Sequence, residues 1–402
     1  MTSASPDVVI VGAGAIGAAC AYQLAGAGAR VIVLERGGGW GEGCSWGNAG
    51  LIVPSHARPI AAPESLRAGL GWMLKRSSPF GLRLRPALAP WLARYMRASS
   101  ASRAAAGEAL QRELAVESLG LLRELAKSLD AGFAQRGCLT VYTDHPEQAA
   151  DEAASKTGRA LGAQLLTGAE VRELEPALTG AVRAGVLFPD EAGCDPVRFV
   201  RSLGDAAIAR GAELRREVAV SALRPGGVAT SAGELSAGHV IVAAGAWSGR
   251  LASTARLRLP MQGGKGYAVE WDPLPLARPL YLHDQRCVAN PLDDRLRMTG
   301  GLILDGLDER FDPRRADAVR AAAAKVLNLR AHPRMRWSGL RPCTPDGLPV
   351  IGTHAKAPRT VFATGHGMLG ITLAPLTGRL VADIVAGRAD HPALSRLTPE
   401  RW

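Results

Sequence analysis

Three glycines near the start of the chain have the spacing of a turn that binds a dinucleotide. Gly12, Gly14 and Gly17 form G-x-G-x-x-G, and Glu35 follows at close to the roughly 20 residues expected for an acid that bonds ribose hydroxyls. The first glycine permits a tight turn, the second lets a pyrophosphate approach the backbone, and the third allows close packing of a helix. Because the Glu35 carboxylate would repel a ribose 2′-phosphate, the pattern predicts FAD or NAD and excludes NADP.

A strand, a helix and a second strand must hold these residues in place. Residues 7–11 read as a buried strand, residues 15–26 as a helix, and a further apolar run ends at Glu35. The helix directs its first N–H groups and the positive end of its dipole at the phosphates. The glycine-rich segment 37–50 then predicts a loop that wraps the cofactor, with a flexible surface loop as the alternative.

Two later strands also run into glycine-rich turns. Strand 239–244 ends at Gly245, and strand 360–363 runs into TGHGMLG, which opens a helix. Both junctions are expected at the sheet edge that carries the first turn. A helix opened by glycines offers its positive end to negative charge, which suits the carbonyl edge of a reduced flavin and has little use for a nicotinamide. The pattern therefore favours FAD.

The rest of the chain predicts a second, discontinuous domain. A chain of 402 residues with 47% apolar residues is too long for one ordinary core. Turn residues separate expected strands at 265–270, 285–290 and 296–299, which indicates an inserted antiparallel sheet. The fold class is α/β, with a Rossmann-like FAD-binding domain and an α+β substrate domain. The FAD-binding domain is assigned residues 1–72, 185–256 and 331–402, and the substrate domain residues 73–184 and 257–330. A strand is also expected at 138–143, and helices at 196–210 and 316–327.

Charge and cysteine usage argue against several other classes of protein. The net charge is +11, but it is dispersed and accompanied by no aromatic-basic motif, so no nucleic-acid partner is expected. The six cysteines are scattered and form no C-x-x-C pair, so neither a metal site nor a disulfide framework is expected. Because the chain has no signal-peptide pattern and no apolar run of roughly 18 residues, a cytoplasmic protein is expected.

One segment leaves a peripheral membrane contact open. Within a helical region at 65–129, segment 88–95 carries an apolar stripe at helical spacing, with Arg94 and Arg97 outside it. The usual meaning is a helix that faces the core. Since further arginines lie just upstream, the alternative is a basic amphipathic surface that touches anionic lipid on the inner face of a membrane.

The motifs together resemble a known family. GAGAIG, GCSWGNAG, GAWS, KGY, GLRPCTPDGLPVIG and TGHGMLGIT are similar to those of FAD-dependent dehydrogenases and oxidases of the D-amino-acid oxidase superfamily. The similarity covers nearly the whole chain and is greatest to bacterial D-amino-acid dehydrogenases, including D-hydroxyproline dehydrogenase-like proteins. It implies non-covalent FAD. The cofactor-binding residues implied are Gly12, Ala13, Gly14, Ile16, Glu35 and Arg36 for the adenosine and pyrophosphate, Ser45, Asn48, Ala49, Gly50 and Leu51 near the flavin ring, and Gly339, Gly367, Met368, Leu369, Gly370, Ile371 and Thr372 on its far side. Gly245 lines the same edge.

The resemblance also suggests substrate-binding residues. Arg341 matches an arginine that holds the substrate carboxylate, and a planar fork of donors is suited to that task, although an ion pair in the domain interface is the alternative. His56 is a candidate for contact with the substrate, or else a surface histidine. Tyr267 is expected either to close the pocket or to lie in the core. For His366 a place near the ring and a turn-filling role stay equally open. Cys343 has the wrong offset for covalent attachment of flavin.

Three functional hypotheses follow. The first is oxidative deamination or dehydrogenation of a D-amino acid or cyclic imino acid of the D-proline or 4-hydroxy-D-proline class, by hydride transfer from Cα to flavin N5. Electrons would then pass to a quinone or another carrier. The second is an oxidase of the glycine or sarcosine type that uses dioxygen and releases hydrogen peroxide. The third is a non-catalytic flavin-binding protein, against which Arg341 and the glycine-rich segment 364–372, here named the closing loop, argue. None requires a covalent nucleophile.

Overall fold

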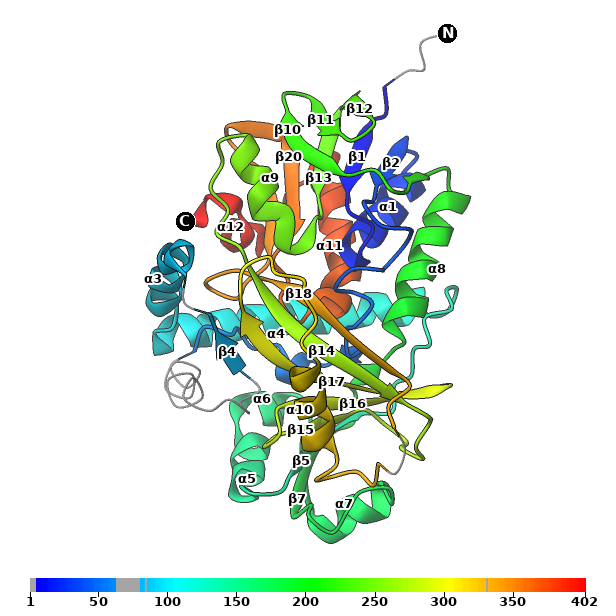
Figure 1. Ribbon diagram of the computed structural model, residues 1–402, viewed down its shortest axis with the longest axis vertical. Coiled ribbons are helices and arrows are strands. Elements are labelled where there is room, and N and C mark those ends of the chain that lie inside the picture. The colour runs from blue at the N-terminus through cyan, green and yellow to red at the C-terminus, as the bar shows by residue number, and fades with distance from the viewer. Residues whose placement is uncertain (1–4, 63–79, 84, 330–331) are drawn as a thin grey trace.

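The computed structural model describes residues 5–62, 80–83, 85–329 and 332–402. The expected domain boundaries at 72/73 and 330/331, and the first part of the helical region predicted from residue 65, lie outside the described residues. Two large sheets dominate the remainder, one in the upper half of Figure 1 and one in the lower half. Their relation to one another determines where a cofactor and a substrate can meet.

The first sheet has six strands and carries all three glycine-rich junctions. Five strands are parallel, and one edge strand, β19, pairs antiparallel with β20. In sheet order the strands are β19 (Val350–His354), β20 (Ala357–Thr364), β13 (His239–Val242), β1 (Val8–Val11), β2 (Val31–Leu34) and β9 (Glu213–Arg215). Because β1, β13 and β20 are parallel neighbours, the turns that follow them meet at one edge, as predicted.

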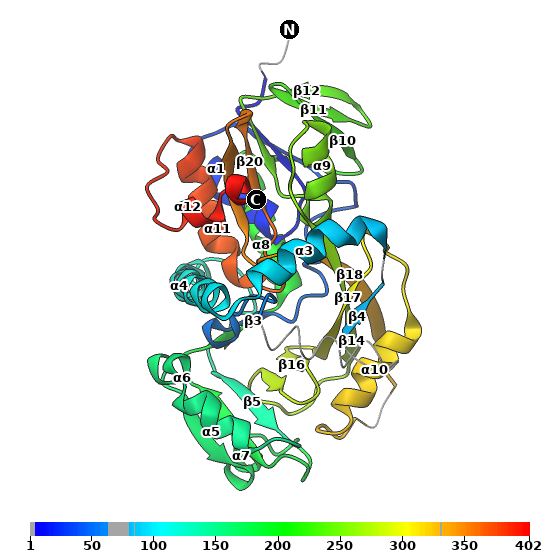
Figure 2. The same cartoon turned by 90° about the vertical axis from the view of Figure 1, so that its left-hand side faces the viewer.

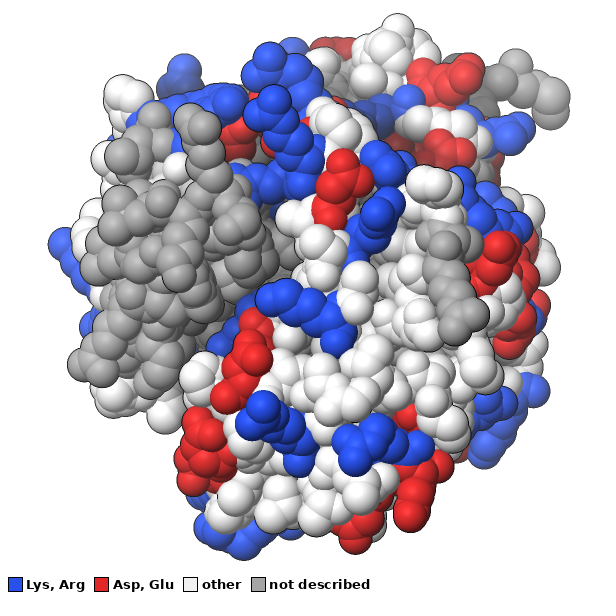
Figure 3. Space-filling view, turned by 60° about the horizontal axis from the view of Figure 1, so that its bottom comes forward, with Lys and Arg blue, Asp and Glu red and all other residues white. Residues whose placement is uncertain are grey.

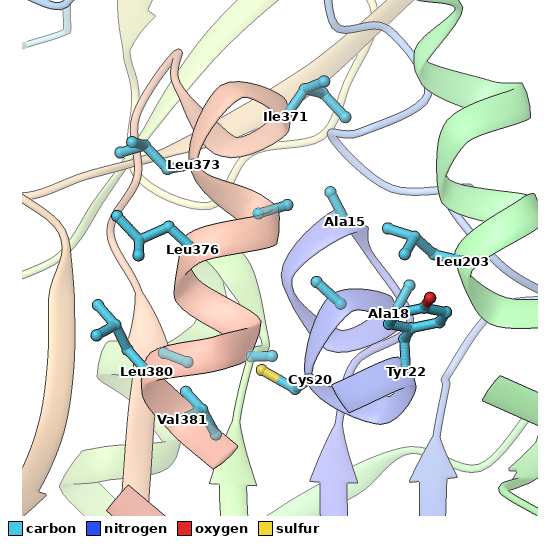
Figure 4. Packing of buried hydrophobic residues seen from close by; sticks show 14 of the residues in the cluster. Ala15, Ala18, Cys20, Tyr22, Leu203, Ile371, Leu373, Leu376, Leu380 and Val381 are labelled. Carbon is cyan, nitrogen blue, oxygen red and sulfur yellow. The ribbon is translucent and has the colours of Figure 1, made fainter. Parts of the chain in front are cut away.

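Three helices cover one face of this sheet. They are α1 (Ala15–Gly26), α8 (Pro196–Ala209) and α11 (Gly370–Val385), whose apolar residues form one core with the sheet. Figure 4 shows the small side chains of α1 lying between α11 and Leu203 of α8. A Cβ on Gly378 would lie 2.6 Å from the carbonyl oxygen of Ala19, so α11 can approach α1 this closely only with glycine there.

Smaller elements cover the other face of the six-stranded sheet. A three-stranded sheet and helix α9 (Ser248–Thr254) pack there around a second core. The three strands are β10 (Val220–Arg224), β11 (Gly227–Thr230) and β12 (Gly233–Ser236). With both faces covered, the apolar run in β1 is buried throughout, as its sequence indicated.

The second sheet has nine strands and is mostly antiparallel. Its order is β18 (Met335–Cys343), β14 (Gln262–Trp271), β17 (Arg295–Leu304), β16 (Cys287–Leu292), β15 (Leu280–Leu282), β5 (Cys138–Tyr142), β7 (Ala184–Phe188) and β6 (Gln164–Thr167), with β4 (Phe80–Leu82) paired to β17. Helix α10 (Pro313–Ala323) and an apolar cluster cover one face. The other face lies toward the segment that follows β2.

The expected α/β class with an inserted antiparallel sheet is therefore confirmed. Residues 185–188 and 335–343, which fall in the ranges assigned to the FAD-binding domain, belong to strands β7 and β18, which both pair within the nine-stranded sheet. The reason is that strand pairing between distant segments decides sheet membership, and the sequence of one strand does not specify its partner. The division into domains otherwise stays a prediction.

Element boundaries differ from the predictions mainly at turns. The strand expected at 285–290 begins only at Cys287, because residues 283–286 form a turn in which Arg286 has a φ of 52°. The helix expected at 316–327 begins earlier, at Pro313, where the Asp312 side chain accepts the first hydrogen bond. The helix after Asp195 begins at Pro196 as predicted.

Of the remaining helices, α3 and α4 lie at mid-height in Figure 2, whereas α5, α6 and α7 lie at its lower end beside β5. The longest is α4, which packs against α11 in the main core. The helices are α3 (Ala89–Ala98), α4 (Ala101–Leu125), α5 (Glu147–Ala154), α6 (Lys156–Ala160), α7 (Gly168–Leu174) and α12 (Leu394–Leu397). A two-stranded pair joins β3 (Leu51–Ile52) to β8 (Ala192–Gly193), and short 3₁₀ turns are η1 (Pro54–His56), η2 (Pro86–Leu88), η3 (Gly245–Trp247) and η4 (Pro399–Arg401).

The apolar stripe of α3 faces the protein. Trp91 stacks on Tyr95 with ring centroids 5.4 Å apart, and its indole N–H donates to the carbonyl oxygen of Cys343. Upstream of α3, Arg83 and Arg85 both pair with Asp305. The core-facing interpretation is therefore confirmed. Of the helices that the structure describes, none is long and apolar enough to cross a bilayer.

Candidate cofactor and substrate site

The turn between β1 and α1 has the close contacts that its glycines predicted. Gly12 has a φ of 104°, and a Cβ there would lie 2.7 Å from the carbonyl oxygen of Ala243. A Cβ on Gly17 would lie only 1.9 Å from the carbonyl oxygen of Gly12. The N–H of Ala15 donates to Ser45 Oγ at 2.9 Å. Ser45, expected near the ring, therefore lies at the helix end where a pyrophosphate would bind.

The Glu35 carboxylate lies at the end of β2 and accepts two backbone hydrogen bonds. Its Oε2 accepts the N–H of Ala13 and its Oε1 the N–H of Gly37, both at 2.8 Å. Each carboxylate oxygen has a second lone pair, so both can still accept from a ribose hydroxyl. Beside it, the guanidinium of Arg36 lies over the Trp247 ring at 3.8 Å, which connects the first and second junctions.

The cofactor loop, residues 37–50, is tied to the amino-terminal end of α11. Asn48 Nδ2 donates to the carbonyl oxygen of Met368 at 3.3 Å, while its Oδ1 accepts the N–H of Gly50 at 2.8 Å. Thr372 Oγ1 donates to the carbonyl oxygen of Leu51 at 2.9 Å. The structure thus brings together residues near 48–51 and 367–372 that lie more than 300 positions apart in the chain.

Two residues of the closing loop contribute differently from the others. Gly367 has a φ of 55° and open space where a Cβ would be, and its N–H donates to the carbonyl oxygen of Pro342 at 3.0 Å. Ile371 is buried in the core that α11 shares with α1, and its side chain contacts protein (Figure 4). Gly245 likewise has open space at the Cβ position, and its carbonyl oxygen accepts from Thr364 Oγ1 at 3.1 Å.

The guanidinium of Arg341 lies on the face of the nine-stranded sheet that is turned toward the cofactor loop. Its Nη1 donates to the carbonyl oxygen of Gly301 at 2.6 Å, and a Cβ on Gly266 would lie 2.1 Å from the same nitrogen. No carboxylate of the described residues comes within 4.0 Å of Arg341. Its charge opposes the effect of burial on the pKa of Cys44, which burial raises. Arg341 therefore offers a half-buried positive charge beside the cofactor loop.

Strand register places a row of side chains across this face. Ala268, Thr299, Val288, Tyr281 and Thr140 are successive cross-strand partners, so their side chains share one face. The row crosses five strands. Its member on β14, Ala268, is two residues from Gly266, so both positions lie on the same face. The row combines polar and apolar groups, as a site for a small polar molecule requires.

Tyr267 points away from this row, which corrects the proposal that it closes the pocket. It neighbours Ala268 on β14, and successive side chains of a strand lie on opposite faces. Its ring packs in the cluster beneath α10, with Phe311 6.1 Å away, and burial raises its pKa to about 12. The core alternative is therefore correct for Tyr267.

His56 lies on the cofactor-facing side and not on the open surface. Its ring is 4.5 Å from Tyr281 and 6.4 Å from Phe188, and its Nδ1 is 2.7 Å from Ser55 Oγ. The N–H of Ser55 donates to Glu191 Oε1 at 2.7 Å. Burial lowers the pKa of His56 to about 3, so the imidazole is neutral. Whether His56 contacts a substrate stays a prediction.

His366 and Cys343 are both buried in the protein. His366 Nε2 is 2.9 Å from Thr377 Oγ1 on α11, so this side chain fills the turn. Cys343 lies in an apolar cluster with Trp91, and burial raises the pKa of its thiol to about 12. A protonated thiol is a poor nucleophile, which supports the expectation of non-covalent flavin.

The structure contains a buried arginine at the cofactor loop that no sequence pattern predicted. Arg297, on β17, is fully buried and donates to backbone carbonyl oxygens of the cofactor loop and to Glu270. The only signal in the sequence is a pair of arginines, at 295 and 297, that alternate with apolar residues in a strand. Such a pattern usually means an exposed face, so the pairing with Glu270 could not be anticipated.

No cluster of histidine, cysteine or acidic side chains in the described parts of the chain could hold a metal ion. Positive and negative side chains alternate over the face displayed in Figure 3, without a surface of one sign.

Comparison with known proteins agrees with this geometry. A family model described as FAD dependent oxidoreductase matches residues 7–384. The chain belongs to this family. FAD, rather than NAD, is therefore its cofactor. Within the family, a protein named D-amino acid dehydrogenase from Paramagnetospirillum magneticum is 35% identical over 423 residues, which cover 98% of each chain. D-amino acid dehydrogenase 2 from Ralstonia nicotianae is 33% identical, over 97% of this chain and 98% of its own.

Solved structures of the family have the same fold. The glycine oxidase from Geobacillus kaustophilus superposes with a TM-score of 0.80 at 27% identity and covers 100% of both chains. The residues present fit FAD on structural grounds as well. The crowded backbone at Gly12 and Gly17, the spare lone pairs of Glu35 and the Ser45 hydroxyl at the end of α1 together suit a ribose and a pyrophosphate.

Proposed function

We propose that this FAD-dependent oxidoreductase removes hydrogen from the α-carbon of a D-amino acid or cyclic imino acid. The observation that carries the proposal is Arg341, a half-buried guanidinium that faces the cofactor loop without a carboxylate partner among the described residues. Such a group recognises a carboxylate by two parallel hydrogen bonds. The names of the two dehydrogenase relatives support the same class of substrate.

The chain's own groups would bind and orient the substrate. Arg341 would hold the carboxylate, and Gly266 would leave room for this contact because it has no side chain. Bound FAD supplies the acceptor for the hydride that leaves the α-carbon. The glycine-rich amino-terminal end of α11 would direct its dipole at the region where negative charge develops. No residue of the chain needs to form a covalent bond.

The substrate side chain would lie along the row that ends near His56 and Tyr281. β15, which carries Tyr281, is two strands from β17, whose Gly301 accepts from Arg341, so roughly 10 Å of sheet separates them. Since the His56 imidazole is neutral, it could accept a hydrogen bond from a substrate amine or hydroxyl. This arrangement favours a compact substrate such as D-proline or 4-hydroxy-D-proline.

The electron acceptor in the proposal is a quinone or another carrier. The dehydrogenase names of the relatives favour a carrier, whereas the glycine oxidase structure favours the second candidate, an oxidase that releases hydrogen peroxide. A peripheral contact with a membrane would suit a quinone acceptor. Because the apolar stripe of α3 packs against protein, only the arginines outside that stripe, Arg94 and Arg97, would be left to meet anionic headgroups.

Anaerobic reduction of the flavin tests the proposal. The yellow holoprotein is mixed without oxygen with D-proline, 4-hydroxy-D-proline, other D-amino acids, glycine and the matching L-forms, and flavin absorbance is followed. We expect bleaching by one or more D-substrates. Air is then admitted, and persistent reduction indicates a dehydrogenase whereas prompt reoxidation with peroxide indicates an oxidase. A flavin that no amino or imino acid reduces would contradict the proposal.

A further inference from the structure

The buried guanidinium of Arg297 connects the nine-stranded sheet to the cofactor loop. Its Nη1 donates to two loop carbonyl oxygens, of Trp46 at 2.7 Å and of Asn48 at 3.1 Å. Its Nε donates to Glu270 Oε1 at 2.8 Å, and its Nη2 lies 2.7 Å from the same oxygen as an ion-pair contact. The side chain is 0% exposed. A charge buried this deeply is stable only when paired, and Glu270 provides the pairing.

Neighbouring side chains hold Glu270 in place or bind the same loop. Glu270 Oε1 also accepts from Arg295 Nε at 3.0 Å, and Arg295 pairs with Asp195, the residue that caps α8, at 2.8 Å. Asn290, the cross-strand partner of Arg297, donates from Nδ2 to the carbonyl oxygen of Ala49 at 2.7 Å. Asn290, Arg297 and Glu270 thus form a row across the sheet. The first two donate hydrogen bonds to three carbonyl groups of the loop, and Glu270 pairs with Arg297.

The orientation of these carbonyls determines where the loop N–H groups point. In a trans peptide the C=O of one residue and the N–H of the next point in opposite directions. With the carbonyls of Trp46 and Asn48 turned into the sheet, the N–H groups of Gly47 and Ala49 point away from it. Neither N–H finds an acceptor among the described residues, whereas that of Gly50 donates to Asn48 Oδ1. Two unused donors therefore lie beside the closing loop of α11.

We propose that Arg297, held in place by Glu270, is a positioning residue for FAD. By holding two loop carbonyls against the sheet, it presents the N–H groups of Gly47 and Ala49 to acceptor atoms of the flavin. This role concerns the cofactor alone and does not depend on which substrate is oxidised. It also explains why a guanidinium is buried here, since one planar group can reach both carbonyls and the carboxylate together.

Binding of FAD to apoprotein variants tests this role. Arg297→Gln keeps a hydrogen-bond donor but cannot reach the two carbonyl oxygens and the carboxylate together. Arg297→Lys keeps the positive charge but carries it on one nitrogen. The matched control is Arg295→Gln, which removes a guanidinium from the same strand and the same carboxylate but touches no loop atom in the structure. Flavin fluorescence quenching gives the dissociation constant, the absorption spectrum reports the flavin environment, and thermal unfolding of each apoprotein reports stability.

We expect Arg297→Gln to weaken FAD binding roughly 10- to 100-fold, from the loss of two charge-assisted hydrogen bonds. The bound flavin spectrum should shift toward that of free FAD. Arg297→Lys should fall between wild type and Arg297→Gln, and Arg295→Gln should change the dissociation constant less than threefold. An Arg297→Gln protein that binds FAD within threefold of wild type would overturn the proposal. An Arg295→Gln protein that lost as much FAD affinity as Arg297→Gln would also overturn it. If Arg297→Gln does not fold, wild-type affinity in Arg297→Lys would overturn it too.

Discussion

The two large sheets provide functional groups in different ways. The six-stranded sheet provides backbone groups at turns, and the residues that shape each turn, such as Gly12 and Gly17, are close together in the sequence. The nine-stranded sheet provides side chains, and Arg341 meets Gly301 only because distant strands pair in one register. The shape of the first cofactor-binding turn is thus specified by nearby residues, whereas the place of Arg341, like that of the cofactor loop held by Arg297, depends on long-range pairing. Substitutions in the two regions should therefore have separable effects.

The largest effect is expected from crowding the first turn. Gly17→Ala would place a Cβ 1.9 Å from the carbonyl oxygen of Gly12, so the backbone of the turn must move. We expect FAD affinity to fall on the order of 100-fold or more, since strain of this kind costs about 1–3 kcal/mol and the phosphate donors also shift. Titration of the apoprotein with FAD measures this affinity. Gly120→Ala, in α4 with open space at its Cβ and outside both the first turn and the cofactor loop, is the control and should bind FAD normally.

The next effect separates the substrate end from the cofactor end. Arg341→Met should lower kcat/KM by roughly 100- to 1,000-fold, because a carboxylate would lose its charged partner, a change worth about 2–5 kcal/mol. FAD affinity should stay within threefold of wild type. Arg336→Met, an exposed arginine of the same strand, is the matched control. Steady-state kinetics measures kcat/KM and titration with FAD measures the affinity. Equal losses of kcat/KM and of FAD affinity in Arg341→Met would show that substrate binding and cofactor binding are not separable.

A buried acid near His56 should make stability depend on pH. Burial raises the pKa of Glu191 to about 8, against roughly 4.3 for an exposed glutamate. The folded state therefore binds this proton more tightly, and the stability it contributes is present below about pH 4 and is lost as pH rises through 8. Glu191→Gln should remove that loss, with a thermal midpoint above wild type at pH 9 and close to it at pH 5. The exposed neighbour Asp190→Asn should show no such trend.

The smallest effect is expected on the far face of the nine-stranded sheet. Tyr267→Phe removes a hydroxyl that lies under α10, so kcat/KM should change less than twofold. Tyr281, on the cofactor-facing side against His56, gives the comparison. Tyr281→Phe retains the ring, whereas Tyr281→Ala should alter KM by at least roughly tenfold through lost packing. Steady-state kinetics with the substrate found by flavin reduction measures both. A large loss in Tyr267→Phe would place the substrate on the wrong side of the sheet.

The same distinction explains what the sequence could predict. The turn from Gly12 to Glu35 and the helix that starts at Pro196 depend on neighbouring residues, and both form as predicted. The sheet membership of β7 and β18 depends on distant partners, and no pattern in the sequence predicted it. Tyr267 was placed in the pocket as one of two alternatives because a motif does not specify a face. Arg297 was missed because its partners, Trp46, Asn48 and Glu270, come from two other segments.

The proposed activity depends on Arg341 binding the carboxylate of the substrate at the flavin. The most direct measurement compares anaerobic flavin reduction by the D-amino or imino acid that reduces wild type with reduction by its carboxamide, in wild type and in Arg341→Met. We predict that wild type prefers the acid by roughly 100-fold or more and that Arg341→Met loses most of this preference. An Arg341→Met variant that still discriminates acid from amide as wild type does would show that Arg341 does not bind the substrate carboxylate.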